Sequence, residues 1–273
     1  NTALDTLRCN DNLLGSLDLS ALTVLRVLYC GNNTALSSLS TAYQTDLHIL
    51  DMSGNTSIYG TFTSIKGTYA SPKKLTTLNI SGCTGIGTLD CSYNEITSLD
   101  VSGCTGLTEL TCTKNQLSAL TLPSLPSLQK LVCNNNQLTS LDVSACPTIT
   151  HLNCRENQLT ALNISVLPSL ATLYCGYNQL TTLDATACSA LTTISCLENR
   201  QMNSLNVSGL SALTTLNCAY CLLPCLDLSG CSALTLVSCG ANRMSKESVD
   251  SLIISLTDRK SLSTKGELRI FYL

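Results

Sequence analysis

The sequence predicts a β-rich solenoid, a fold in which one short unit is wound and stacked many times. Three observations lead to this fold class. Apolar residues return at a fixed interval, as at Leu128, Ile149 and Leu170. A Cys and an Asn follow each of them at a nearly constant distance. The 273 residues include no Trp and only two Phe, which suits a core that repeats one layer of Leu, Cys and Ile.

The interval between these apolar residues is mostly 21 positions, and such self-similarity is the signature of a repeat architecture. Two steps, from Leu25 to Leu47 and from Leu191 to Leu213, are one residue longer. We expect the extra residue in the turn after the Asn, near 200–202 in the second case. The repeat markers are Leu4, Leu25, Leu47, Ile86, Leu107, Leu128, Ile149, Leu170, Leu191, Leu213 and Leu234.

Each unit reads L-x-x-L-x-C-x-x-N-x-L-x-x-L-D/N-V/I/L-S, and the copy at 128–148 is representative. This pattern resembles the leucine-rich repeat, in the short bacterial form whose extended second half replaces a helix. The resemblance covers residues 4–244. It implies a right-handed superhelix with a parallel concave sheet, short extended second halves on the convex side, and an internalin-like secreted or surface protein.

The segment around the Cys predicts a short strand in every unit. In Leu131-Val132-Cys133, alternation places Leu and Cys on the inner face and Val132 outward. Strands of successive units then pair in parallel. The outward positions are free to vary, and they form the usual working surface of the family that the sequence resembles.

The 17 cysteines would suggest a disulfide framework, but their spacing favours free thiols. Most occupy two repeat positions, and Leu replaces Cys at some copies of the second, as expected of small buried hydrophobes. Cys221 stands where an Asn belongs, and a bond between Cys221 and Cys225 remains open. The two sets are Cys9, Cys30, Cys91, Cys112, Cys133, Cys154, Cys175, Cys196, Cys218 and Cys239, and then Cys83, Cys104, Cys146, Cys188 and Cys231.

Two polar positions also recur. The Asn three residues after the Cys is predicted to point inward and to bond the backbone groups of a turn. An Asp or Asn later in the unit is predicted to cap the turn that closes the coil, with calcium binding by stacked carboxylates as the alternative. The inward positions are Asn12, Asn33, Asn55, Asn94, Asn115, Asn136, Asn157, Asn178, Asn199 and Asn242, and the capping positions are Asp18, Asn79, Asp100, Asp142, Asn163, Asp184, Asn206 and Asp227.

The predicted organisation is a solenoid over 1–244 and a C-terminal cap over 245–273. An irregular loop or degenerate coil at about 56–74 interrupts the solenoid, because Ile86 follows Leu47 by 39 residues. In the cap, Ser245 can act as an N-cap before a helix, and a strand over Glu267–Leu273 follows. The apolar face of this helix is predicted to comprise Val249, Leu252, Ile253 and Leu256.

Composition and motifs argue against several function classes. With 15 basic and 18 acidic residues, no cationic surface for nucleic acid or an anionic membrane is expected. No apolar run approaches the roughly 20 residues of a membrane-spanning helix. The two histidines, His48 and His151, lie far apart in the repeat, and no hydrolase, phosphate-loop or zinc motif occurs. We therefore expect no enzyme, no cofactor and no metal.

The outward residues of the strands and of the turn before each Asn are the candidate site. Tyr and Arg are enriched in binding hot spots. The middle units are expected to bring two tyrosines close to basic side chains. The candidate partner-binding residues are Tyr174, Tyr177, Arg155, His151, Lys130, Tyr93 and Tyr220.

The expected function is recognition of a macromolecule, a protein first, through the concave face. Carbohydrate binding is one alternative, although the lack of Trp counts against it. A structural spacer or adhesion stalk without a discrete site is another. The family resemblance implies an extracellular or cell-surface location, with a signal or anchor upstream of Asn1. Free thiols are more usual in the cytoplasm, which stays the alternative location. The oligomeric state is not predicted.

Overall fold

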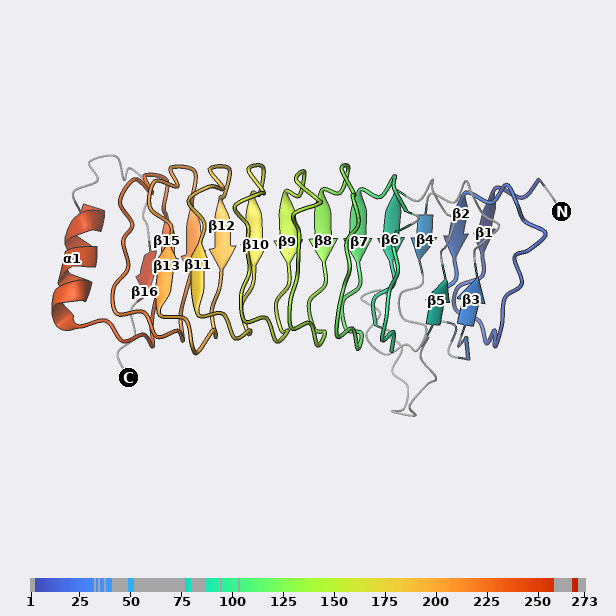
Figure 1. Cartoon of the computed structure of the whole chain (residues 1–273), viewed down its shortest axis with the longest axis horizontal. Helices are drawn as coiled ribbons and strands as arrows, with labels where there is room; N and C mark the ends of the chain where they lie inside the picture. Colours follow the sequence, from blue (N-terminus) through green and yellow to red (C-terminus); the bar gives the residue numbers. More distant parts are fainter. Residues whose placement is uncertain are drawn as a thin grey trace. The chain divides into compact units, whose positions relative to one another are not determined.

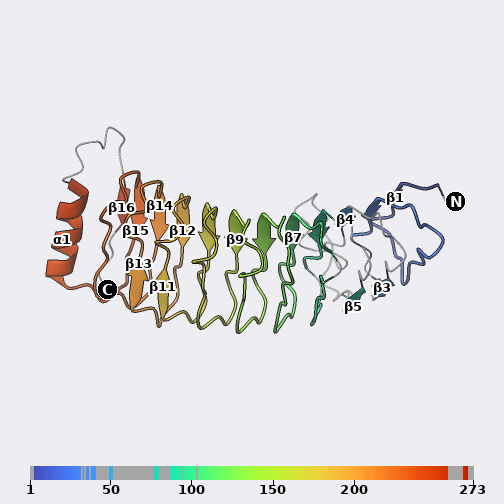
Figure 2. The same ribbon diagram turned by 45° about the horizontal axis from the view of Figure 1, so that its top comes forward.

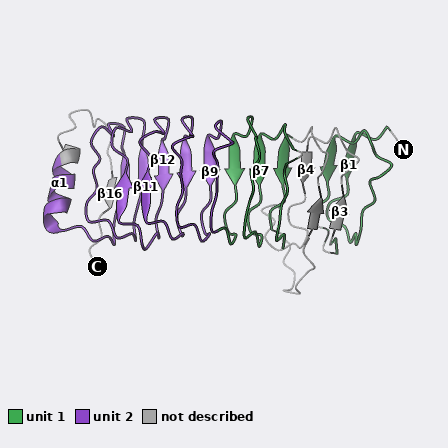
Figure 3. Cartoon of the chain, viewed as in Figure 1, with its two compact units in different colours: residues 1–138 green, residues 139–273 purple. Residues whose placement is uncertain are grey.

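The computed structural model describes residues 3–31, 33, 35–36, 38–40, 49–51, 77–79, 87–93, 95–102, 104–257 and 267–269. These residues fall into two compact units, Asn1–Leu138 and Thr139–Leu273, which are called unit 1 and unit 2 (Figure 3). The excursion predicted at 56–74 lies outside the described residues, and so do His48, Asn55 and Asn94.

Unit 1 is a stack of coils whose first halves form a parallel sheet (Figure 1). A second parallel pair, β3 (Ser38–Ser40) with β5 (Thr77–Asn79), lies in the second halves of two coils. The strands of the main sheet are, in order, β1 (Thr6–Arg8), β2 (Val27–Tyr29), β4 (Ile49–Asp51), β6 (Thr88–Asp90), β7 (Glu109–Thr111) and β8 (Lys130–Val132).

Unit 2 has the same construction, and Figure 2 shows its two sets of strands on opposite sides of the coils. The second halves contribute β11 (Thr182–Asp184) and β13 (Ser204–Asn206), which pair in parallel. Helix α1 (Lys246–Thr257) follows the last coil. The main strands are β9 (His151–Asn153), β10 (Thr172–Tyr174), β12 (Thr193–Ser195), β14 (Thr215–Asn217), β15 (Leu236–Ser238) and β16 (Glu267–Arg269).

Each strand is three residues long, and its middle residue points inward. In β10, Leu173 is fully buried while Thr172 and Tyr174 face outward and are half-buried. Leu173 lies opposite Leu152 and Ile194 on the neighbouring strands, so the repeat period sets the register. The chain is thus a parallel β-solenoid, as the sequence predicts.

The core is made of the apolar residues that recur in each unit. Leu170, Leu173, Cys175 and Leu180 are all fully buried, and the equivalent residues of the other inner coils are buried as well. Each large aliphatic side chain that is removed from water stabilises the fold by roughly 1.5–3 kcal/mol. Repetition of this one layer explains why the sequence needs no Trp and almost no Phe.

The inward Asn residues join each coil to the one before it. The Nδ2 amide of Asn178 donates to the carbonyl oxygens of Cys154 (3.0 Å) and Cys175 (3.1 Å), and its Oδ1 accepts the N–H of Leu159 (3.0 Å). The predicted inward ladder is therefore confirmed for the buried members, whereas Asn12, in the first coil, is exposed and bonds only within its own turn. Bonds of this kind to the preceding coil are made by Asn33, Asn115, Asn136, Asn178, Asn199 and Asn242.

Cys221 replaces Asn at a coil junction where the Asn acceptor is not needed. The coil before it is one residue longer, and its turn closes on itself, because the N–H of Met202 donates to the carbonyl of Asn199 (2.8 Å). The other long coil does the same from Leu36 to Asn33 (3.0 Å). The thiol of Cys221 lies 3.6 Å from the carbonyl oxygen of Cys196. In unit 2 the extra residue thus removes the need for an Asn acceptor at position 221.

The second halves of the coils end in side-chain caps, as predicted. The Oδ1 of Asp100 accepts the N–H of Ser102 (2.8 Å), and Asp142 does the same with Ser144 (2.9 Å). These bonds lower the pKa of both carboxyl groups below the ordinary value. Equivalent caps are made by Asp18, Asn163, Asp184, Asn206 and Asp227.

Helix α1 begins where the sequence predicts. The Oγ of Ser245 accepts the N–H of Ser248 (3.2 Å), which is the bond of an N-cap. Val249 and Leu252 are buried. Ile253 was expected on the same buried face but is 40% exposed, since the helix buries a stripe too narrow to include it. The division into a solenoid over 1–244 and a cap over 245–273 stays a prediction. In the described part of the chain, no helix has the length and apolar character to cross a membrane.

Candidate functional site

The outward side chains of β9, β10, β12 and β14 form a surface that we call the strand face of unit 2. The only large side chains on it are His151 and Tyr174, which meet diagonally across the paired strands β9 and β10. Their ring centroids lie 5.9 Å apart at an interplanar angle of 63°. The strand face is therefore a mostly polar floor with an aromatic pair on it. Its small outward residues are Asn153, Thr172, Thr193, Ser195, Thr215 and Asn217.

A ridge of side chains follows the strand face, at the residue before each inward Asn and before Cys221. In unit 2 all of these residues have a positive φ, between 53° and 60°, and none is glycine. The geometry is imposed by the stack, because the N–H of Tyr177 donates to the carbonyl of Leu197 in the next coil (2.8 Å). Left-handed backbone costs roughly 1–2 kcal/mol for an ordinary L-residue. The αL ridge of unit 2 comprises Glu156, Tyr177, Glu198, Tyr220 and Ala241.

Two arginines pair with the αL ridge. The guanidinium carbon of Arg155 lies 4.5 Å from the centroid of the Tyr177 ring, in a cation–π contact. Its Nε is 3.2 Å from Oε1 of Glu156, but this Nε–H makes no hydrogen bond, so the contact is an ion pair only. The Nε–H of Arg200 donates to Oε2 of Glu198 at 2.7 Å. Acid and base are therefore balanced along the ridge.

The structure brings together most of the predicted candidates that lie in unit 2. His151 contacts Tyr174, and Arg155 lies over Tyr177. Tyr220 lies two coils further along the αL ridge and is 46% exposed.

The other candidates lie in unit 1, where each has a partner of its own. Lys130 was expected beside Tyr174, and its Nζ lies 3.3 Å from Oε2 of Glu109 on the neighbouring strand. Tyr93 has the Nζ of Lys114 5.1 Å from its ring centroid.

Arg200 was missed by the sequence analysis. It lies in the turn of the 22-residue coil, where no other coil of unit 2 has a corresponding residue. The 22-residue step from Leu191 to Leu213 already showed that this turn has an extra residue. A long, charged residue in such a turn must point outward, and this was the signal that could have identified Arg200.

The thiols are buried and free, as the spacing predicts. Burial raises the pKa of Cys154 to about 12 and the pKa of Cys175 well above its ordinary value. The interaction between the two neighbouring thiols raises the pKa of Cys196, which burial raises further, and lowers the pKa of Cys221. Both Cys221 and Cys225 are free, and Cys225 is exposed. Among the described residues, no group of three or more His, Cys, Asp or Glu side chains is arranged to hold a metal ion.

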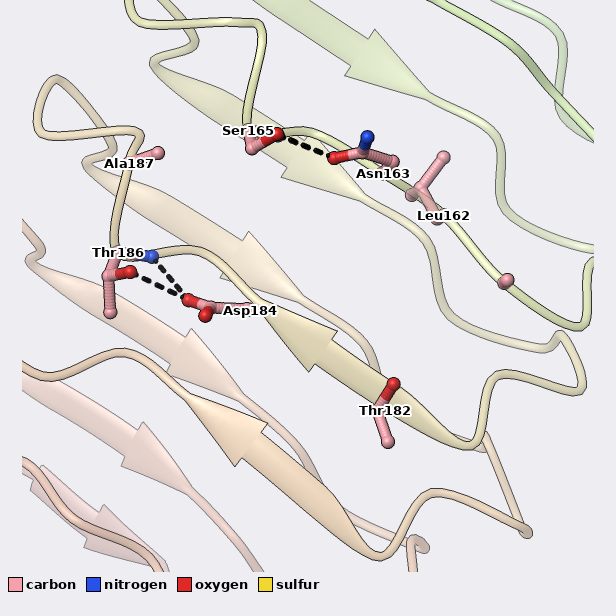
Figure 4. A pocket seen from close by; sticks show the side chains of 8 residues that line it. Leu162, Asn163, Ser165, Thr182, Asp184, Thr186 and Ala187 are labelled. Atoms are coloured by element: carbon pink, nitrogen blue, oxygen red, sulfur yellow. Dashed lines mark hydrogen bonds between the residues drawn. The ribbon is translucent and has the colours of Figure 1, made fainter.

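A shallow cavity of about 350 Å³ lies between the second halves of two coils of unit 2 (Figure 4). Its polar groups are engaged with one another: Ser165 donates its N–H and hydroxyl to Oδ1 of Asn163, and Thr186 does the same to Asp184. No aromatic ring lines it, so it offers little to a ligand. The lining residues are Ala161, Leu162, Asn163, Ser165, Thr182, Asp184, Thr186 and Ala187.

No protein-family model matches the chain, and no curated protein matches it in sequence. Solved structures do match. The functional domain of InlJ from Listeria monocytogenes, which includes a cysteine ladder, aligns with a TM-score of 0.74 and 30% identity. That alignment covers 90% of this chain and 55% of the InlJ chain, so this chain spans about half the length of that relative.

Two more distant structures share the fold. An internalin, InlF from Listeria monocytogenes, aligns with a TM-score of 0.52 and 21% identity over 93% of this chain and 76% of its own. The leucine-rich-repeat protein LIC12759 of Leptospira interrogans aligns with a TM-score of 0.50 and 18% identity over 99% and 84%. The stacked Leu, Cys and Asn positions described above agree with these likenesses. The chain is therefore a leucine-rich-repeat protein with a ladder of buried cysteines, and it is similar to the functional domain of InlJ.

Proposed function

We propose that the chain is a non-enzymatic module that binds a protein partner through the strand face and αL ridge of unit 2. The similarity to other leucine-rich-repeat structures supports an interaction module in general terms. One observation carries the choice of surface. Tyr177 holds a bulky ring, 40% exposed, in left-handed backbone, and Arg155 lies against that ring.

The side chain of Tyr177 is costly at its position. Asn tolerates left-handed backbone far better than Tyr does, and Asn135 stands at the same position in unit 1. Arg155 restricts the ring before any partner arrives, which reduces the entropy lost on binding. Because Tyr and Arg are the commonest hot-spot residues, this pair suits the centre of a protein interface.

Carbohydrate binding is less well supported by the same contacts. A sugar stacks on the open face of an aromatic ring, but the guanidinium of Arg155 covers one face of Tyr177. Cations lie over other outward rings as well, with Lys114 over Tyr93 and Arg8 over Tyr29. A spacer without a discrete site would have no use for a strained, pre-ordered tyrosine.

The proposal includes an extracellular or cell-surface location and no role for nucleic acid. Each arginine of the αL ridge is paired with a glutamate, so the surface has no excess positive charge for a phosphate backbone. Buried thiols are compatible with an oxidising environment because the reactive thiolate does not form at neutral pH.

Parallel arrays of extracellular protein domains and of glycans, probed with the labelled chain, test this function. We expect a protein hit whose affinity falls at least tenfold in the Tyr177→Asn variant, since Asn keeps the turn and removes the ring. The matched control is Lys114→Asn, which changes the same turn position in unit 1 and should leave the affinity unchanged. A glycan hit without a protein hit, or equal loss in both variants, would contradict the proposal.

A further inference from the structure

The departures of unit 2 from its own repeat meet at one place. The extra residue of the long coil lies in the turn from Asn199 to Met202, and this turn satisfies its own N–H group. The next coil has Cys221 instead of Asn, and two turns that flank the long one have Tyr177 and Tyr220 on the αL ridge. Where a repeat only has to stack, its length and its key residues are preserved. A place where both depart from the repeat therefore indicates a function.

The long turn adds one outward side chain, Arg200. Its side chain is 75% exposed, while that of Glu198 beneath it is only 15% exposed. The bond from Nε to Glu198 fixes one edge of the guanidinium group. Among the described residues, neither Nη group of Arg200 has a hydrogen-bond partner, so the other edge is free.

The tyrosines on either side belong to the same arrangement. Glu198 raises the pKa of Arg200 through its hydrogen bond and its charge, and the nearby hydroxyls of Tyr220 and Tyr177 contribute less. Tyr177, Glu198 and Tyr220 are consecutive members of the αL ridge, about 4.8 Å apart per coil. Arg200 is therefore a fixed cation with an aromatic residue on each side.

This geometry fits an anion and not a cation. The carboxylate that would hold a basic side chain, Glu198, is already occupied by Arg200. The free Nη edge presents parallel N–H donors, which match the two oxygens of a carboxylate. Tyrosine rings at the rim exclude water around such a contact and strengthen it.

We infer that Arg200, held by Glu198 between Tyr177 and Tyr220, binds an Asp or Glu carboxylate of the protein partner. This inference rests on the proposed function, because it names the chemistry of the partner at the same surface. Glu198 is a positioning residue here, and Arg200 makes the contact.

A random peptide library displayed on phage, selected on the whole chain, supplies the probes for the test. We expect the enriched peptides to share an Asp or Glu. A synthetic peptide with an enriched sequence should bind the Arg200→Gln variant at least tenfold more weakly than the parent chain. Replacing the acidic residue of the peptide by Asn or Gln should weaken its binding to the parent chain equally, and this amide peptide should bind the Arg200→Gln variant no more weakly than it binds the parent. The control is Arg243→Gln, an exposed arginine in the turn of a regular coil, which should change nothing.

Three outcomes distinguish this inference from the proposed function on which it rests. If the Arg200→Gln change and the amide change weaken the same contact, as described, both the inference and the proposed function are supported. Peptides that bind independently of Arg200 but fail on Tyr177→Asn overturn the carboxylate contact and leave the proposed function standing. If no enriched peptide depends on either residue, both ideas are wrong for this surface.

Discussion

At the scale of the residue, the inward Asn is the group on which the stack most depends. Asn178 shows this: it accepts the N–H of Leu159 in the preceding coil and donates to the carbonyls of Cys154, Cys175 and Gly176, all away from water. Removal of such a side chain leaves several buried polar groups unpaired, and each of these costs about 1–3 kcal/mol.

We expect Asn178→Ala to lower the free energy of unfolding by about 3 kcal/mol or more, because buried backbone groups lose their partners. Asn163→Ala is the control, since Asn163 caps an exposed turn, and its loss should cost only about 1 kcal/mol. Urea unfolding followed by circular dichroism measures both. Equal effects would show that burial of the inward ladder contributes nothing special.

At the scale of the element, the second halves of the coils are held by exposed caps instead of a continuous sheet. Of the described second halves, only those at β3 and β5 and at β11 and β13 pair as strands. Elsewhere an Asp or Asn side chain accepts the N–H two residues on. The carboxylates among these caps are acceptors whose strength depends on pH.

Acid should weaken these caps. The pKa values of Asp100, Asp142 and Asp184 are lower in the folded chain than in the unfolded one. Their contribution to the free energy of unfolding is therefore fully present above about pH 5. It is lost as the pH falls below the ordinary pKa of Asp, about 3.9, and through the lower pKa of the folded state. Replacement of all three by Asn keeps the caps, as Asn163 shows. We expect the triple variant to lose less stability than the parent between pH 7 and pH 3. An unchanged pH dependence would rule out this role.

At the scale of the whole molecule, the buried thiols form an interior that is unreactive. Because burial keeps the pKa of Cys154 near 12, the thiolate is scarce at neutral pH. This removes the conflict between many free cysteines and a location outside the cell. The exceptions among the described cysteines are Cys225, which is exposed, and Cys9, which is half-buried.

Alkylation with iodoacetamide at pH 8, mapped by mass spectrometry, tests this interior. We expect Cys225 to react in the native protein, and Cys154 and Cys175 to react only after unfolding. The Cys225→Ser variant should abolish the fast reaction. Native disulfides within the ladder, or labelling of Cys154 as fast as Cys225, would contradict the account.

Much of the fold could be predicted because the repeat shows each side-chain role many times. The strand around Leu131, the inward Asn136 and the cap at Asp142 all follow from position in the unit. The site could be predicted only in part. The left-handed backbone of Tyr177 and the placement of Arg155 over its ring depend on φ and on rotamers, which no periodicity reveals. The spacing of the repeat revealed the extra residue near Arg200, but the outward position of the Arg200 side chain was not predicted from it.

The inward Asn also gives the stack a direction, because its side chain bonds to the backbone of the preceding coil. Its amide reaches back to the carbonyl of the Cys one coil earlier, and its oxygen receives an N–H from that same earlier coil, as at Asn136 and Asn115. Each coil therefore depends on the coil that follows it to pair its buried polar groups. A chain cut after any such coil would leave its last coil with unpaired backbone groups.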